Sequence, residues 1–379
     1  MRVLVISVTA GGGHNSAAAA LREALEARGH QVLEADLYRQ CAGPLAARLV
    51  DRVYRFSAAH LRRRYHTVYA RLEWEPRLRR RFLRLALPPL LCRRLQALVA
   101  EAAPDRVIAT HVFPALALCR LRAAGKCPPP VDGVVTDYCL HPLWEDCDGL
   151  RRLTIAAPAL AEEAVNRGVP ADSLGYEGIP IRSVFRQLPD KAEARRRLGL
   201  AEKPTVLLMG GSMGYGSLWR TALCLRRVPE VQTVCICGGN RLARALLRPR
   251  AGPKLRVLGY TADMADYMAA ADLAVTKPGG LTLAELAAAG LPALLTRPIP
   301  GHEERNLAFA AGLGCAAVAP GGPRATATAA ASLLNDPAAL TAMKTALAEL
   351  ARPHAAEAVA EFREALDKAE NHDRIRMKI

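Results

Sequence analysis

The side chains best suited to chemistry follow predicted β-strands closely. Gly11, Gly12 and Gly13 end the apolar run RVLVISV, and His14 comes directly after them. Because an unshifted imidazole titrates near neutrality, His14 is a candidate general base. The alternative is that His14 only donates a hydrogen bond to a phosphate at the start of the following helix.

A second candidate catalytic group lies after the run VDGVVTD. Asp137 and His141 share this loop, so a carboxylate and an imidazole could act there as an alternative catalytic pair. Aspartate at a turn is also a frequent helix cap, so a structural role for Asp137 stays open.

A phosphate-binding turn is predicted between Thr276 and Asn306. The turn Pro278-Gly279-Gly280 separates a buried strand from a helix that should start near Thr282, where free N–H groups suit a diphosphate. Glu285 lies one helical turn further on, where its carboxylate could hold two ribose hydroxyls. Thr282 and Glu285 also have the spacing of a capping box, which is the structural alternative.

These turns belong to a repeated alternation of strands and helices. Apolar runs bounded by glycine turns occur in both halves of the chain, and this pattern is typical of doubly wound α/β domains. Each half has its own glycine-rich first turn, which predicts two facing Rossmann-like domains. We place them at residues 1–185 and 186–352, with a helix in 353–379 that packs back on the first domain.

Composition excludes several classes of protein. Hydrophobic residues make up 51% and charged residues 23% of the 379, which excludes a disordered chain. The N-terminal MRVLVISVTAGGGH lacks a charged leader and a cleavage site, so we expect a strand and a cytoplasmic protein. The ten cysteines form no CxxC pairs, which favours buried thiols over a metal site.

Positive charge is concentrated in a basic insert, residues 48–94. It holds 14 arginines against three acidic residues, a balance of 14 − 3 = +11 out of a net +16. Apolar residues recur at helical spacing from Val50 to Leu72, and six of the 18 aromatic residues lie in the insert. An ordinary solvated helix and a nucleic-acid site are alternatives, but arginines beside an apolar stripe favour anionic membrane lipid. The residues expected at the membrane are Arg62, Arg63, Arg64, Trp74, Arg79, Arg80, Arg81 and Phe82.

Several of these segments together resemble one enzyme family. Residues 276–306 (TKPGGLTLAELAAAGLPALLTRPIPGHEERN) resemble the donor-binding signature of the monogalactosyldiacylglycerol synthase and processive diacylglycerol β-glucosyltransferase family, in glycosyltransferase family 28. TAGGGHNSAAAAL, VTDYCLHPLW, GIPIR and MGGSMGYG resemble its other motifs, in the family's order over about 300 residues. His302 stands where relatives often carry glutamine.

The resemblance implies a GT-B fold, an N-terminal acceptor domain and a C-terminal donor domain. It also implies inverting transfer from a UDP-sugar without a metal or other cofactor. Gly11, Gly12 and Gly13 would form an acceptor or phosphate loop. Donor-binding roles would fall to Gly211, Ser212, Gly214, Gly279, Gly280, Thr282, Glu285, Glu303, Glu304 and Asn306.

The resulting hypothesis is an enzyme on the inner face of the cell membrane that transfers glucose or galactose from UDP to 1,2-diacylglycerol. Its partners would be the UDP-sugar, diacylglycerol and anionic lipids, with no nucleic acid. Two alternatives stay open: a polyprenyl-diphosphate-linked acceptor, and a membrane-associated regulator that binds UDP-sugar without turnover. The sequence does not determine the oligomeric state.

Overall fold

The computed structural model describes residues 1–9, 12–127 and 129–361. Gly11 and residues 362–379 of the predicted last helix therefore lie outside the described residues. Within these ranges, no helix is both long enough and apolar enough to span a bilayer.

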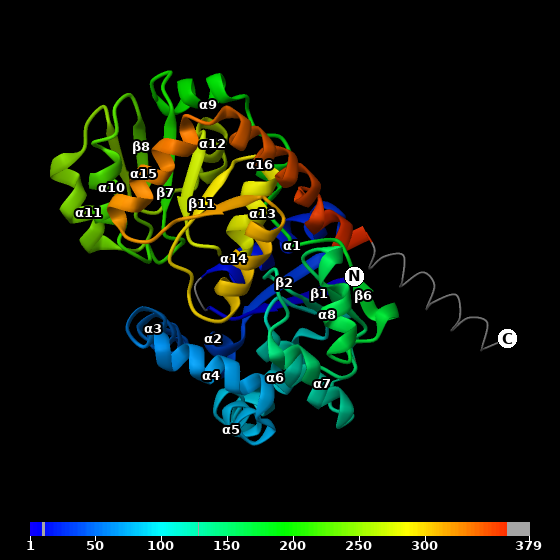
Figure 1. Ribbon diagram of the computed structural model, residues 1–379. Coiled ribbons are helices and arrows are strands. Elements are labelled where there is room, and N and C mark those ends of the chain that lie inside the picture. Colours follow the sequence, from blue (N-terminus) through cyan, green and yellow to red (C-terminus); the bar gives the residue numbers. More distant parts are fainter. Residues whose placement is uncertain (10–11, 128, 362–379) are drawn as a thin grey trace.

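The chain forms two α/β domains, each built on one parallel sheet of six strands (Figure 1). In the N-terminal sheet the order is β2-β1-β3-β4-β5-β6, and in the C-terminal sheet it is β12-β11-β10-β7-β8-β9. The strands of the first sheet are β1 (Arg2–Ser7), β2 (Gln31–Asp36), β3 (Arg106–Ala109), β4 (Val131–Val134), β5 (Arg152–Thr154) and β6 (Leu174–Gly175). Those of the second are β7 (Thr205–Met209), β8 (Gln232–Ile236), β9 (Leu255–Leu258), β10 (Leu273–Thr276), β11 (Ala293–Leu295) and β12 (Ala316–Val318).

Helices cover these sheets, as the alternating pattern predicts. The N-terminal domain carries α1 (Gly13–Ala27), α2 (Leu37–Ala42), α3 (Pro44–His60), α4 (Arg62–Trp74), α5 (Pro76–Ala86), α6 (Pro89–Ala102), α7 (Val112–Ala123) and α8 (Ala161–Asn166). The C-terminal half carries α9 (Lys191–Leu198), α10 (Leu218–Leu225), α11 (Arg241–Leu247), α12 (Met264–Ala270), α13 (Gly280–Ala288), α14 (His302–Gly312), α15 (Pro323–Leu334) and α16 (Pro337–Leu350).

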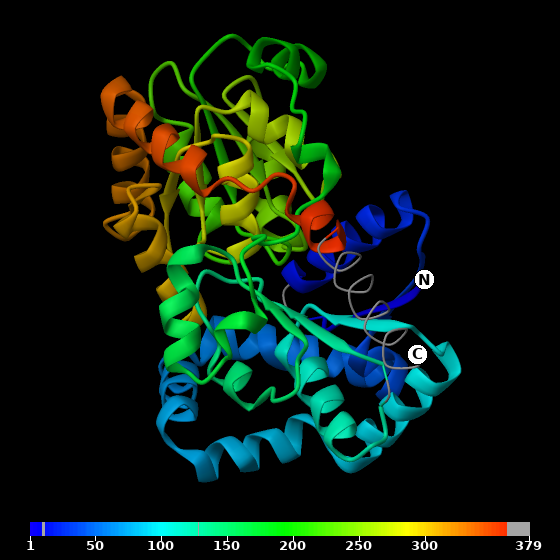
Figure 2. The ribbon, with the colours of Figure 1, turned by 90° about the vertical axis from the view of Figure 1, so that its right-hand side faces the viewer.

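The basic insert is a chain of short helices along one side of the N-terminal domain (Figure 2). The predicted stripe from Val50 to Leu72 is divided between α3 and α4, which meet at Leu61. Pro44, Pro76 and Pro89 each occupy a first helical position. Proline has no N–H to lose at such a position, and its fixed φ suits a helix start, so the boundaries are encoded locally.

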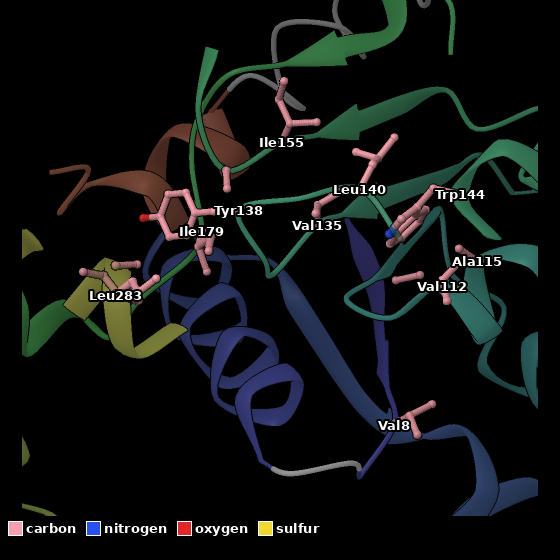
Figure 3. Packing of buried hydrophobic residues seen from close by; sticks show 14 of the residues in the cluster. Val8, Val112, Ala115, Val135, Tyr138, Leu140, Trp144, Ile155, Ile179 and Leu283 are labelled. Carbon is pink, nitrogen blue, oxygen red and sulfur yellow. The ribbon is translucent and has the colours of Figure 1, made fainter. Parts of the chain in front are cut away.

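Packing contacts join the halves of the chain. Residues 355–361 are helical, and Val359 is buried in a cluster with Val3 and Leu21 of the N-terminal domain. This confirms the prediction that the last helix returns to that domain. Leu283 on α13 packs in the same core as Tyr138 and Ile179, as Figure 3 shows.

Candidate active site

Both sheets reverse their strand order at one point, and the two reversals face each other. In the first sheet the reversal falls between β1 and β3, and in the second between β7 and β10. Loops leaving the carboxyl ends of such strand pairs diverge, which leaves room for a ligand. His14 follows β1, whereas Lys277 follows β10.

The facing loops enclose a cleft of about 490 Å³. Gly12 approaches the opposite domain so closely that a Cβ placed there would lie 2.8 Å from Ser212 Oγ. Predicted residues that line the cleft are Gly12, Gly13, His14, Asp137, Gly211, Ser212, Gly279, Gly280, Thr282, Glu285 and Glu303. The glycine turn at Gly12 and Gly13 therefore faces the glycine turns of the C-terminal domain across one groove.

His14 is held in one tautomer by its surroundings. Its Nδ1 lies 2.9 Å from the Thr110 carbonyl oxygen and 2.9 Å from Thr136 Oγ1. A carbonyl oxygen can only accept, so Nδ1 carries the proton and the lone pair is left on Nε2. Burial lowers the pKa of His14, against the opposing charge of Asp137. A neutral imidazole of this kind can accept a proton at neutral pH.

Asp137 and His141 share a loop and both line a second, apolar cavity, but only Asp137 also lines the cleft. Asp137 lines the cleft, and although burial opposes its ionisation, electrostatic interactions with His302, His14 and Lys277 and a hydrogen bond from Asn306 hold its pKa below the usual range. His141 does not line the cleft.

The Nδ1 of His141 accepts the N–H of Leu143 at 3.2 Å, where it caps a short 3₁₀ helix, Pro142–Asp146. Burial lowers its pKa to about 3. His141 is thus a neutral capping group with an edge-on contact to Tyr69.

The phosphate turn begins earlier than the sequence suggests. Helix α13 starts at Gly280 with Gly279 as its N-cap, and no side chain caps it. Thr282 is therefore inside the first turn, and the capping box that it could form with Glu285 is absent at this helix. The free N–H groups of this first turn lie at the end of the helix that lines the cleft, where they favour binding of an anion.

Glu285 is a carboxylate without a hydrogen-bond partner among the residues that the structure describes. Burial raises its pKa to about 7, and the charge of Arg182 opposes this shift. Glu285 and Arg182 both line the cleft. A carboxyl group that lines a cavity without a protein partner has its oxygens available to accept hydrogen bonds from a ligand.

Lys277 is a cleft residue that the sequence analysis missed. It forms an ion pair with Glu303, which is 2% exposed and also accepts the Ile299 N–H at 2.8 Å. A Cβ on Gly211 would lie 2.8 Å from Lys277 Cε. The lysine therefore lies beside the two glycine turns of the C-terminal domain, at Gly211 and at Gly279. Its position directly after β10 was the available signal, because strand ends of this sheet meet at the ligand site.

Three residues expected at the donor lie elsewhere. Glu304 accepts the Gly301 N–H at 3.0 Å and caps α14, and it lies 3.4 Å from His66 Nδ1. Gly214 is buried against the end of β8, where a Cβ would strike the Cys237 carbonyl. Asn306 is fully buried and bonded to protein groups, so the prediction that it faces the nucleotide sugar is wrong for this structure.

A second cavity, of about 680 Å³, adjoins the cleft. Its walls are mainly apolar and come from α3, α4, α5, the start of α7 and the loop after β4 with its 3₁₀ helix. They include Leu49, Val53, Val68, Leu72, Phe82, Leu85, Val112, Phe113 and Trp144. Five residues line both this apolar pocket and the polar cleft: His14, Tyr54, Thr136, Asp137 and His302. A group at the end of an apolar ligand can therefore reach the polar cleft at this junction.

The predicted membrane residues point in different directions. Trp74 is 81% exposed, and Arg63, Arg64, Arg80 and Arg81 are also exposed, while the side chain of Arg62 lies outside the described part. Arg79 donates to the Leu72 and Glu73 carbonyls and to Glu145 at 3.0 Å, which contradicts a membrane role. Phe82 packs on Phe113 and lines the apolar pocket instead of facing out.

Comparison with known proteins identifies both halves of the chain. Residues 14–181 match the family model of monogalactosyldiacylglycerol synthase, and residues 205–319 match the C-terminal domain of glycosyltransferase family 28. The chain belongs to glycosyltransferase family 28. The first matched segment begins at His14, directly after the N-terminal glycine turn, and the second contains the Gly279–Gly280 turn, so both segments contribute residues to the cleft.

Curated relatives of this family 28 protein match over nearly its whole length. It is 28% identical to a processive diacylglycerol beta-glucosyltransferase of Bacillus mycoides, with 94% of this chain and 91% of the relative covered. It is also 28% identical to the protein of that name from Bacillus cereus, over 98% and 94%.

Solved structures confirm the GT-B fold of the family 28 chain. Acinetobacter baumannii MurG aligns with a TM-score of 0.62 at 18% identity, covering 95% of this chain and 98% of its own. Staphylococcus aureus MnaA, solved with UDP, gives 0.66 at 12% identity, over 97% of both chains. Anabaena Alr3699/HepE in complex with UDP gives 0.55 at 14% identity, over 96% and 100%.

Proposed function

We propose that this protein transfers glucose or galactose from a UDP-sugar to the free hydroxyl of 1,2-diacylglycerol, with inversion at the sugar carbon. The observation that carries the proposal is the junction of a polar cleft and an apolar pocket at His14 and Asp137. A nucleotide sugar suits the first cavity, and a lipid suits the second. The names of the curated relatives and the UDP in two similar structures support the same assignment.

In the proposed reaction, the donor lies in the cleft with its diphosphate at the start of α13. Lys277 and the free N–H groups of the Gly279–Gly280 turn would neutralise the phosphates, and Glu285 would accept from the ribose. His14 Nε2 would take the proton of the lipid hydroxyl. The oxygen then attacks the anomeric carbon opposite the phosphate, and the bond to UDP breaks with its electron pair on the phosphate oxygen.

Thin-layer chromatography of lipid products tests this function. Radiolabelled UDP-glucose, UDP-galactose and UDP-N-acetylglucosamine would each be incubated with diacylglycerol or with a polyprenyl-diphosphate-linked sugar. We expect label in a β-glycosyl-diacylglycerol, with glucose or galactose as the sugar. Product only on the polyprenyl acceptor would select the alternative substrate, and UDP binding without any product would select the regulator.

Glu285 gives the first quantitative test of the donor site. Glu285→Gln should weaken UDP-glucose binding by about 10- to 100-fold, because a charged acceptor is replaced by a neutral one. Since the pKa of Glu285 is about 7 in the empty cleft, wild-type affinity should rise as the pH increases through 7 and the carboxylate forms.

Isothermal titration calorimetry with UDP-glucose between pH 6 and pH 8.5 measures both effects. The variant should lose the increase with pH as well as the affinity. Equal affinity at every pH, combined with a lower melting temperature, would instead assign Glu285 a purely structural role.

We further propose that the insert docks the enzyme on the inner membrane leaflet, mainly through α3. Leu45, Leu49, Val53 and Phe56 are more than half exposed on one side of this helix. Leu49 and Val53 also line the apolar pocket, so the exposed side is continuous with the proposed lipid site. Exposed arginines on α3 and α4 would supply attraction to anionic headgroups.

Vesicle sedimentation tests the docking surface. Replacing Leu45, Leu49 and Phe56 with serine should reduce binding to phosphatidylglycerol-containing vesicles by at least 10-fold, because each side chain loses its burial in the bilayer. Leu242→Ser is the matched control, since Leu242 is 69% exposed on the C-terminal domain. An equal loss in both variants, or none in either, would refute a specific role for α3.

A further inference from the structure

Asn306 connects three segments of the protein from a completely buried position. It lies on α14 in the C-terminal domain, and its exposed fraction is 0%. Its Oδ1 accepts the Tyr138 N–H of the N-terminal domain at 2.7 Å. Its Nδ2 donates to Asp137 Oδ1 at 2.7 Å and to the Pro278 carbonyl at 3.0 Å.

These partners fix the orientation of the amide. A backbone N–H can only donate, and a carbonyl oxygen can only accept, so Tyr138 and Pro278 together determine which end of Asn306 is nitrogen. The nitrogen is then directed at the Asp137 carboxylate. Asn306 thus has a definite donor role toward Asp137.

Asp137 depends on this contact. Within the described ranges, Asn306 is the only hydrogen-bond donor to the Asp137 carboxylate, and it reaches only Oδ1. The other oxygen is left for the junction of the cleft and the apolar pocket, which Asp137 lines. Because Asn306 comes from the donor domain, Asp137 receives its hydrogen bond only when the two domains are together.

The surrounding backbone reinforces this dependence. Gly280, at the start of α13, lies directly against the Thr136 carbonyl. A Cβ at this position would be only 2.7 Å from Asp137 Cα. Pro278, which Asn306 also bonds, belongs to the same turn. One buried amide therefore links the phosphate turn of the donor domain to the carboxylate of the acceptor domain.

We infer that Asn306 is a positioning residue that aligns the Asp137 carboxylate with the proposed reaction centre on domain closure, and that it does not contact the sugar. This inference rests on the proposed function, since it names the group that prepares that same site. Asp137 aligned in this way stabilises the positive charge that His14 gains when it accepts the proton. An open enzyme without this alignment has a weaker base, which limits wasteful hydrolysis of the donor.

A double-mutant cycle on the full-length enzyme tests the inference. Asn306→Ala should lower kcat by on the order of 100-fold, leave the donor KM within about threefold, and leave UDP affinity unchanged. Asp137→Asn should cause a similar loss. If Asn306 acts through Asp137, the double variant should be no slower than Asp137→Asn alone, because the second change removes an interaction already lost.

Asn306→Leu has a volume close to that of asparagine and also removes the amide donor, so it replaces the alanine variant in the cycle if that variant does not fold. Thermal melting of each variant separates a loss of folded protein from a loss of turnover. Multiplying losses in the double variant, or a raised donor KM with unchanged kcat, would overturn the inference. Absence of glycolipid from the wild-type enzyme would instead refute the proposed function.

Discussion

Replacing His14 with asparagine should lower kcat by about 100- to 10,000-fold while UDP-glucose affinity stays within a few fold of the wild-type value. The range is that of a general base removed from a reaction that needs proton transfer. Asparagine can still donate to the Thr110 carbonyl that anchors Nδ1, so the loop should keep its position. Steady-state kinetics and calorimetry on the same preparation measure the two quantities.

The pH profile of this variant distinguishes proton transfer from simple positioning. Only neutral His14 can accept a proton, and burial lowers its pKa from 6.5. Wild-type kcat should therefore persist below pH 6.5 and fall only as the pH drops through the lowered pKa. His14→Asn should lack this decrease.

His141→Asn is the matched comparison, because asparagine can still accept the Leu143 N–H that His141 caps. We expect it to keep most of the wild-type kcat. If this variant loses turnover and the His14 variant does not, the base has been assigned to the wrong imidazole.

Gly280→Ala should reduce kcat/KM by on the order of 100-fold, the cost of displacing reacting groups by about 1 Å. A Cβ at this position would overlap the Thr136 carbonyl oxygen and lie 2.7 Å from Asp137 Cα, so the two domains must separate to admit it. The displaced groups are the phosphate turn and the loop that carries Asp137.

Gly312→Ala provides the control for Gly280→Ala. Gly312 ends α14, and a Cβ there would meet nothing within 4 Å. This variant should keep wild-type kinetics and gain slightly in stability, since alanine favours a helix more than glycine does. Small-angle scattering with and without UDP should show a wider separation of the domains only in Gly280→Ala. Full activity in that variant would mean that this close approach is not needed for turnover.

Local patterns in the sequence were sufficient to locate the strands and the glycine turns. The run RVLVISV contains β1, and the run VDGVVTD contains β4. An apolar run between turn residues has few alternatives to a buried parallel strand, and ligand-binding loops follow the carboxyl ends of such strands. This is why His14 and the Gly279–Gly280 turn could be assigned to a site before their surroundings were known.

The basic insert shows where such patterns are insufficient. Helical spacing placed Tyr69, Val68 and Leu72 in one stripe, but Tyr69 and Leu72 are buried against the protein, whereas Val68 is 43% exposed. Periodicity gives the apolar side of a helix without saying whether protein or lipid covers it. The packing of α4 and α5 on the N-terminal domain decided this, and it left α3 as the most exposed apolar helix of the insert.

The sequence alone determined two parallel α/β units, each with a glycine turn beside a residue able to bind phosphate or accept a proton. Only the tertiary structure decided which polar side chains meet across the groove. Lys277 and Arg182 enter the cleft, Glu304 caps its own helix, and Asn306 bonds the opposite domain. The reason is physical: strand and turn formation depends on neighbours within a few residues, whereas these contacts depend on how two separately encoded domains are placed against each other.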